Sequence, residues 1–335
     1  MVIFMEVNQV QEMMMELRKI PQDQMNHTRQ KIAEIMITLF KQEQIWVLLG
    51  QETTPETYGT NNAYPRLALS HLKRLSVWMF SSEQTARQYI DKHQYFVTTG
   101  NDGVPDTTKP LCAVVTGSVA AGIAYQGMFK GALDVVLDDG SLSLIISTSD
   151  FVNFAFMAQG KERIITPGEG IFIDTINIMR FQNSNIYVCA DKETAAHQLM
   201  AFNFRLDATG NAIKLFAEEA ISQDYARKVL GHAQFSAKAT LKTLAQGLVN
   251  MLPDRLDYRI ELYRERNVFV LSFLKALQLL DKMGIVQRQG GPLTSPQTQD
   301  TVADDIVGTL ADAKASDELS DEDAIAQRSK IISSN

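Results

Sequence analysis

Residues 75–93 read LSVWMFSSEQTARQYIDKH, and this stretch decides the fold class. Its first six residues are mostly apolar and β-prone, which predicts a strand. Ser81 or Ser82 then begins a helix, because a serine N-cap followed by an acidic residue in the first turn, here Glu83, is typical of helix starts. A strand that leads directly into a helix indicates an α/β chain.

The residues before this stretch predict two helices and a strand. Apolar side chains recur at helical spacing in residues 6–19 and 28–43, which indicates amphipathic helices. The run IWVLL at 45–49 predicts a buried strand, and a polar loop follows at 51–65. The methionines near the start fit helix packing, although a flexible partner-binding face is an alternative.

The residues after it predict a loop, a strand, a helix and a hairpin. We expect a loop at 98–110, a strand at 111–116 and a small-residue helix from Gly117. The run LDVVLDDGSLSLIIS has β-prone residues on both sides of Asp139-Gly140, which is a strong hairpin signal.

The second half gives a similar mixture. Residues 171–178 (IFIDTINI) alternate apolar and polar side chains, which predicts a half-buried strand. The remaining expected elements are strands at 186–189 and 256–262, and helices at 191–200, 217–230, 236–252 and 267–283.

Composition changes near residue 287. The segment QRQGGPLTSPQTQD is followed by a stretch in which residues 295–335 hold nine acidic and three basic residues. Such a segment buries too little apolar surface to offset chain entropy. We therefore expect N-terminal helices in 1–43, an α/β unit in 44–150, a second α/β unit with a helical C-terminal part in 151–286, and a disordered acidic tail in 287–335.

Two segments share a pattern. Residues 77–90 and 186–199 both read as strand, polar cap, acidic residue, Thr-Ala and helix. The predicted fold class is accordingly α/β (α+β), with two related strand–helix units, mixed sheets and an N-terminal helical segment. Chance similarity is the alternative explanation, since the strand–cap–helix pattern is common.

The first unit resembles the SseB N-terminal-domain family over about residues 28–150. The resemblance rests on LLG after a strand, on Phe80-Ser81-Ser82-Glu83 in the place of the family's "FTs.E", and on the closing run LDVVLDDGSLSLII. The family's usual Asn-Pro-Gly turn is replaced by Asp139-Gly140. The resemblance implies an α/β domain of a bacterial protein, and it supplies no catalytic residues.

The sequence contains no recognisable catalytic or metal-binding motif. The Gly-rich run from Gly117 lacks the spacing of a nucleophile elbow or a phosphate loop. No two histidines are three or four residues apart, and Cys112 and Cys189 each lie in an apolar run, so neither a metal nor a cofactor is expected. A polar loop offers the only candidate site residues, namely Asn101, Asp102, Asp106 and Lys109, with turn formation as the competing explanation.

Charge and hydropathy exclude some partners. The net charge is −7, and residues 295–335 carry −6 of it, so a clustered basic surface for nucleic acid is not expected. No apolar run is long enough for a membrane span, and the N-terminus does not resemble a signal peptide, so we expect a cytoplasmic protein.

The leading hypothesis is a non-enzymatic bacterial protein that binds another protein. One alternative is an enzyme with a site assembled around loops 51–65 and 98–110. Another is a secretion-associated or phage-related assembly component. An exposed apolar patch within 6–19 or 267–283 would favour binding.

Overall fold

The structure is a computed structural model and describes residues 8–54, 65–99, 104–139, 142–182, 184–189, 211–231, 236–250 and 258–286. It is an α+β fold with mixed sheets, so the predicted fold class is confirmed. The described chain divides into two compact units at residue 164/165, with 129–131 grouped with the second. We call them unit 1 and unit 2.

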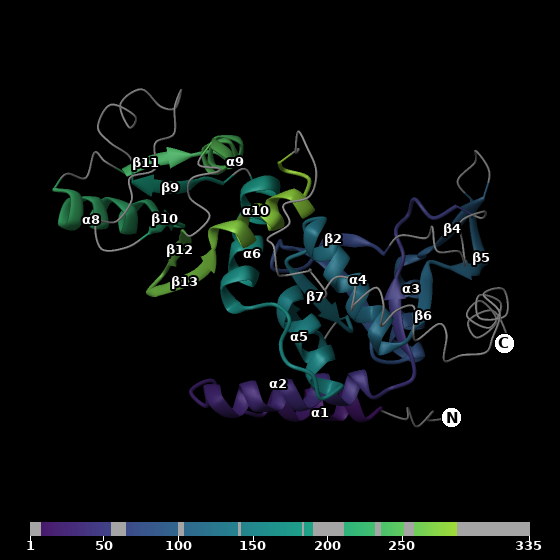
Figure 1. The fold of residues 1–335 in the computed structure, drawn as a ribbon. Helices are drawn as coiled ribbons and strands as arrows, with labels where there is room; N and C mark the ends of the chain where they lie inside the picture. The colour runs from purple at the N-terminus through teal and green to yellow at the C-terminus, as the bar shows by residue number, and fades with distance from the viewer. Residues whose placement is uncertain are drawn as a thin grey trace. The chain divides into compact units, whose positions relative to one another are not determined.

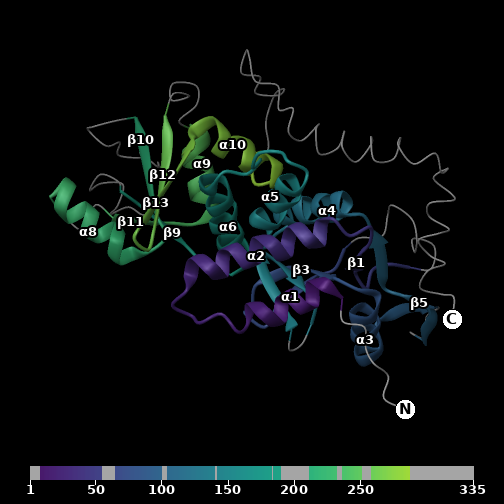
Figure 2. The same ribbon diagram turned by 90° about the horizontal axis from the view of Figure 1, so that it is seen from below.

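Unit 1 begins with the two predicted helices. Helix α1 spans Gln9–Leu17 and α2 spans Met25–Phe40. The two helices lie side by side (Figure 2) and bury the apolar stripe that predicted them. Asn8 caps α1, because its side chain accepts a hydrogen bond from the Gln11 backbone N–H.

The sheet of unit 1 has a parallel pair at its centre. Its strand order is β6-β1-β3-β7-β8, and β2 pairs with the first part of β3. Strands β3 and β7 are parallel and the other neighbours are antiparallel. The strands are β1 (Ile45–Leu48), β2 (Leu67–Leu69), β3 (Leu75–Phe80), β6 (Cys112–Val115), β7 (Asp134–Leu137) and β8 (Leu144–Ser147).

Helices cover both faces of this sheet, as a parallel pair requires. Helix α3 (Glu83–His93) packs on β1 and β3 and begins at the Ser82 N-cap, as predicted. Helix α4 (Gly117–Phe129) approaches the opposite face so closely that a Cβ on Gly127 would lie 2.9 Å from Val77 Cγ2. Helix α5 (Thr148–Ala158) packs on β7, β8 and α2.

Unit 2 contains a second mixed sheet (Figure 1). Its strand order is β11-β9-β10-β12-β13, with β10 and β12 parallel and the other neighbours antiparallel. The strands are β9 (Ile186–Cys189), β10 (Ala212–Phe216), β11 (Ser236–Ala239), β12 (Arg259–Arg264) and β13 (Asn267–Ser272). The helices are α6 (Pro167–Phe181), α8 (Glu219–Leu230), α9 (Leu241–Asn250) and α10 (Phe273–Lys282).

The two units share one core topology, to which unit 1 adds β2, β4 (Phe96–Thr99) and β5 (Val104–Pro110). The order β1, β3, α3, β6, α4, β7, β8, α5 in unit 1 corresponds to β9, β10, α8, β11, α9, β12, β13, α10 in unit 2. Corresponding strand pairs also have the same orientation. In addition, α2 precedes the first strand of unit 1 as α6 precedes that of unit 2.

The strand registers agree residue by residue. Trp46 lies opposite Phe80 in unit 1, and Tyr187 lies opposite Phe216 in unit 2. The corresponding pairs are Leu48–Cys112 with Cys189–Ser236, Ser76–Asp134 with Ala212–Arg259, and Asp134–Ser147 with Arg259–Ser272. One consistent set of equivalent residues satisfies all four pairings, so the described chain contains a structural repeat.

The repeat corrects the similarity expected from the sequence. The sequence pattern pairs residues 77–90 with 186–199, but β9 occupies the position of β1 rather than that of β3. The segment equivalent to β3–α3 is β10–α8, in which Phe216, Glu219 and Tyr225 match Phe80, Glu83 and Tyr89. The helix expected at 191–200 lies outside the described residues.

The strand predicted at 171–178 is wrong, because these residues lie in α6. Thr166 and Glu169 form a capping box and Pro167 is in the first turn, and these are strong helix-start signals. Side chains are buried around much of this helix, so its apolar and polar residues do not mark an inner and an outer face.

Three other segments also differ from the prediction. The loop expected at 98–110 contains β5 (Val104–Pro110), which pairs with β4 (Phe96–Thr99). The helices expected at 236–252 and 267–283 each begin with a strand, β11 and β13, before α9 and α10. In both segments a hydroxyl side chain, Thr240 or Ser272, caps the helix and marks the change.

The unit boundary also differs from the expected position at residue 150. Helix α5 runs through that position and packs on α2, β7 and β8, so it closes unit 1. The acidic segment from residue 287 onward lies outside the described residues.

Candidate functional site

An exposed strip of valine side chains lies on the sheet of unit 2. Helix α8 packs on β9, β10 and β11, at one side of the sheet. At the opposite edge of the sheet, Val268 and Val270 of β13 are 48% and 51% exposed. Residues two apart on a strand share a face, so we call these two residues the valine strip. An exposed apolar patch within 267–283 is the feature that the sequence associated with binding.

A buried carboxylate lies directly beside the valine strip. Glu261 of β12 is opposite Val270 in the sheet and accepts three hydrogen bonds. Its Oε2 accepts from Lys214 Nζ at 2.7 Å and from the Tyr263 hydroxyl at 3.1 Å, while its Oε1 accepts from Arg259 Nε at 2.8 Å. Lys214 and Glu261 are both buried, whereas the Arg259 side chain is 53% exposed.

Aromatic rings surround this ionic cluster. The rings of Phe216 and Tyr263 are stacked with centroids 4.8 Å apart, and Tyr225 of α8 lies 6.1 Å from Tyr263. Lys214 Nζ lies 5.6 Å from the Tyr225 ring centroid and 5.9 Å from that of Tyr263. The ammonium group therefore has both an anionic partner and ring faces close by.

The ionic contacts determine the charge state of Glu261. Burial is the largest influence and by itself raises the pKa of this carboxyl group. The hydrogen bonds from Lys214 and Arg259 outweigh it, so the pKa lies below the ordinary value of 4.5. Burial also raises the pKa of the neighbouring Tyr263, which remains a protonated hydrogen-bond donor.

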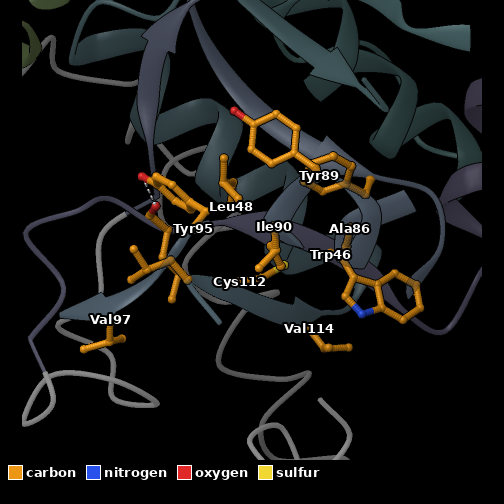
Figure 3. Packing of buried hydrophobic residues seen from close by; sticks show 12 residues of the cluster. Trp46, Leu48, Ala86, Tyr89, Ile90, Tyr95, Val97, Cys112 and Val114 are labelled. Atoms are coloured by element: carbon orange, nitrogen blue, oxygen red, sulfur yellow. Dashed lines mark hydrogen bonds between the residues drawn. The ribbon is translucent and has the colours of Figure 1, made fainter. Parts of the chain in front are cut away.

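Unit 1 has apolar residues at the two positions equivalent to Lys214 and Glu261. The strand pair Trp78–Val136 occupies the place of Lys214–Glu261. Figure 3 shows the cluster beneath α3, with Ile90 and Cys112 near its centre and Trp46, Tyr89 and Tyr95 around them. At the position of Arg259, unit 1 has Asp134, which is buried and lies 2.9 Å from Arg74 Nε.

Unit 1 has a buried polar cluster where β3 and β7 end. Asp138 has a positive φ of 57°, and its oxygens accept hydrogen bonds from the Ser81 N–H, the Ser81 hydroxyl at 2.6 Å and the Thr85 hydroxyl at 2.8 Å. The Asn8 side chain donates to the Ser81 carbonyl at 2.8 Å. Burial raises the pKa of Asp138, although these hydrogen bonds oppose the effect. The cluster joins β7, α3 and α1.

The structure shows only part of the predicted polar-loop site. Asp106 and Lys109 lie on β5, with Asp106 Oδ2 and Lys109 Nζ 3.7 Å apart. The Thr108 hydroxyl and N–H both donate to Asp106 Oδ1, and these bonds lower the pKa of Asp106. Asn101 and Asp102 lie outside the described residues, as do residues 55–64 of the other candidate loop. Asp106 and Lys109 therefore make a local contact within β5.

Both cysteines are buried in strands, as the sequence predicts. Burial raises the pKa of Cys112 strongly and that of Cys189 to about 11, so both are thiols at neutral pH. Of the histidines, His93 lies 3.9 Å from Asp139, while His197 and His232 fall outside the described ranges. In those ranges no three His, Cys, Asp or Glu side chains are grouped as a metal ion would need.

Sequence reasoning missed Lys214, Arg259 and Glu261. The available signal was the alternation of Tyr258, Ile260 and Leu262, which places Arg259 and Glu261 together on the opposite face of the strand. Lys214 lies within the apolar run AIKLF, and a lysine in such a run indicates a buried charge with a partner. The pairing of the two strands brings these signals together.

Comparisons with known proteins supply no identity. The chain matches no protein-family model, no curated protein and no solved structure. The resemblance to SseB-type domains therefore stays a prediction from sequence. No described helix combines the length and apolar character that crossing a membrane would require.

Proposed function

We propose that this protein functions by binding another protein, without catalysis, through the valine strip of unit 2. The observation that carries the proposal is the exposure of Val268 and Val270 side by side on one strand face. Exposed neighbouring apolar residues with polar groups around them are typical of interaction surfaces. The cytoplasmic location predicted from the sequence belongs to the same proposal.

The charges around the strip indicate the chemistry of the partner. Arg259 lies at one end of the β12–β13 hairpin and on the face of the strip, because it is opposite Ser272. The turn at the other end carries Arg264, Glu265 and Arg266, so the cationic side chain next to the apolar centre is Arg259. A partner segment with apolar residues and a carboxylate at the Arg259 end would match it in charge.

The repeat supports the proposal by comparison. In unit 1 the residue equivalent to Val270 is Ile145, which is half-buried and lies opposite Val136. The same fold can therefore keep this position partly covered. Exposure in unit 2 is a property of its own residues, and binding supplies a reason for it.

The test compares partner capture by two matched double variants. Full-length tagged protein, purified from its host, would carry Val268→Asp with Val270→Asp. The control would carry Leu69→Asp with Leu72→Asp, which changes two exposed leucines of unit 1. We expect a stoichiometric partner with the wild type and the control, and at least tenfold less of that partner with the strip variant.

Circular dichroism and thermal melting would establish that both variants are folded. Equal recovery of the partner by the strip variant would contradict the proposal. Loss of the partner with the leucine control alone would also contradict it, because binding would then depend on unit 1.

A further inference from the structure

Arg259 is held at one end of the valine strip in a fixed orientation. Its Nε donates to Glu261 Oε1 at 2.8 Å, and Glu261 is itself held through its other oxygen by Lys214 and Tyr263. A guanidinium group has five N–H donors in a planar fork, and this contact uses the one on Nε. Within the described part of the chain, no second carboxylate contacts this guanidinium group.

The exposed part of Arg259 points to a ligand group. With 53% of the side chain exposed, the terminal nitrogens can bind an anion from solvent without leaving Glu261. A carboxylate matches this fork with two parallel hydrogen bonds. Because Glu261 already orders the side chain, less conformational entropy is lost on binding.

The position of Arg259 fits an extended ligand. Arg259 lies opposite Ser272, and Ser272 is two residues beyond Val270, so Arg259 lies next to the strip on the same face. A partner in extended conformation presents alternate side chains on one face. Two apolar side chains and a carboxylate at successive alternate positions would therefore meet Val268, Val270 and Arg259.

We propose that Arg259 is the receptor for a carboxylate on an extended segment of the partner protein, with Glu261 as the residue that positions it. This inference rests on the proposed function of the valine strip. Unit 1 differs at this position, because Asp134 occupies the place of Arg259 and is paired with Arg74. At this position of the repeat, the outward-facing cation belongs to unit 2.

The test uses two terminally blocked peptides, acetyl-Thr-Val-Thr-Val-Thr-Glu-amide and its twin with glutamine in place of glutamate. Both place two valines and the last residue on one face of a strand. Amide chemical shifts of uniformly labelled full-length protein would be followed during titration. We expect shifts in residues 259–272, and about tenfold weaker binding of the glutamine twin.

Variants separate the receptor from the residue that positions it. Arg259→Gln should remove the preference between the peptides, and Arg259→Lys should keep part of it, since the charge remains without the fork. Glu261→Gln should reduce the preference several-fold while the valine contacts persist. A preference that survives Arg259→Gln would overturn the role of Arg259.

Equal binding of the two peptides by the wild type, or shifts confined to residues outside the hairpin, would also overturn the inference. The proposed function has its own outcome. Loss of a natural partner with the strip variant, together with no peptide preference, would retain the valine strip as a binding surface and reject the carboxylate receptor.

Discussion

The two units have one topology and different chemistry on the sheet face beneath α3 and α8. Unit 1 has the apolar pair Trp78 and Val136 there, and unit 2 has Lys214 and Glu261 at the equivalent positions. Both sheets nevertheless keep the same strand order and registers. The comparison shows that the ionic cluster is not required by the fold, which leaves it available for function.

A small set of features is common to both units. The rings of Phe80 and Tyr89 lie 5.4 Å apart at 48°, and those of Phe216 and Tyr225 lie 5.3 Å apart at 44°. Each pair attaches the central strand to the following helix. Ser147 and Ser272 both cap the closing helix in the same way. These contacts are therefore retained where the residues equivalent to Lys214 and Glu261 differ.

The largest expected effect comes from breaking the ionic cluster of unit 2. Lys214→Met should lower the free energy of unfolding by about 3–5 kcal/mol, because Glu261 would lose its buried cation. Lys214→Met combined with Glu261→Val, which approaches the apolar pair of unit 1, should restore stability to within about 1 kcal/mol of the wild type. Urea denaturation of the three proteins measures this, and a double variant as unstable as the single one would refute the equivalence of the faces.

The second effect concerns the polar cluster of unit 1. Asp138→Ala should cost about 3 kcal/mol, because buried donors of Ser81 and Thr85 would lose their acceptor. Unit 2 has Tyr263 at the end of the equivalent strand and no such carboxylate. As a control, Asp139→Ala changes the neighbouring, more exposed carboxylate and should cost much less. Similar melting temperatures for the two variants would contradict this role of Asp138.

A smaller effect distinguishes the two thiols. Cys112→Ser should lower the free energy of unfolding by about 2 kcal/mol, because the hydroxyl would enter an apolar cluster. Cys189→Ser should lower the free energy of unfolding by about 1 kcal/mol or less. Ser222 and Ser236 are hydrogen-bonded to each other nearby and can accept a hydrogen bond from the new hydroxyl. Thermal melting compares the two, and the reverse order would show that the surroundings of the thiols are misassigned.

The smallest effect is on the pH dependence of stability, and its sign differs between the units. The pKa of Glu261 is lowered by folding, so its contribution is present above pH 4.5 and is lost as pH falls through the folded-state value. The pKa of Asp138 is raised, so its ionisation lowers stability as pH rises from 3.8 through the folded-state value.

Glu261→Gln should therefore reduce the loss of stability at acid pH. Asp138→Asn should remove the decline in stability that accompanies ionisation of Asp138. Urea melts at closely spaced pH values from 3 to 7 would resolve the two slopes. Parallel profiles for the wild type and both variants would show that neither Glu261 nor Asp138 is a source of the pH dependence.

The sequence predicted elements where local signals agree. Strand Leu75–Phe80 and the helix after Ser82 were predicted because an apolar run, a serine cap and an acidic first turn coincide. Residues 171–178 were misassigned because the alternation of eight residues outweighed the capping box just before them. Segments 236–252 and 267–283 were assigned as single helices because a strand and a helix that follow each other directly look like one apolar run.

The candidate site could not be predicted for a different reason. Lys214 and Glu261 are 47 residues apart in the sequence and meet only because β10 and β12 pair in parallel. Strand alternation places Val268 and Val270 on one face, but it does not say whether that face is covered. Exposure depends on where α8 packs, which is a property of the whole unit.

The parallel central strand pairs also determine when each unit can complete its sheet during synthesis. Strand β3 must wait for β7, and the sheet of unit 1 is complete only when Ser147 has left the ribosome. The equivalent residue of unit 2 is Ser272, about 125 residues later. At roughly 5–20 residues per second, unit 1 has about 6–25 s to fold before its repeat is complete. Strands β3 and β10 have the same registers but carry different side chains on the face beneath α3 and α8. Because unit 1 has this head start, pairing of strands within each repeat is favoured over exchange of strands between the two repeats.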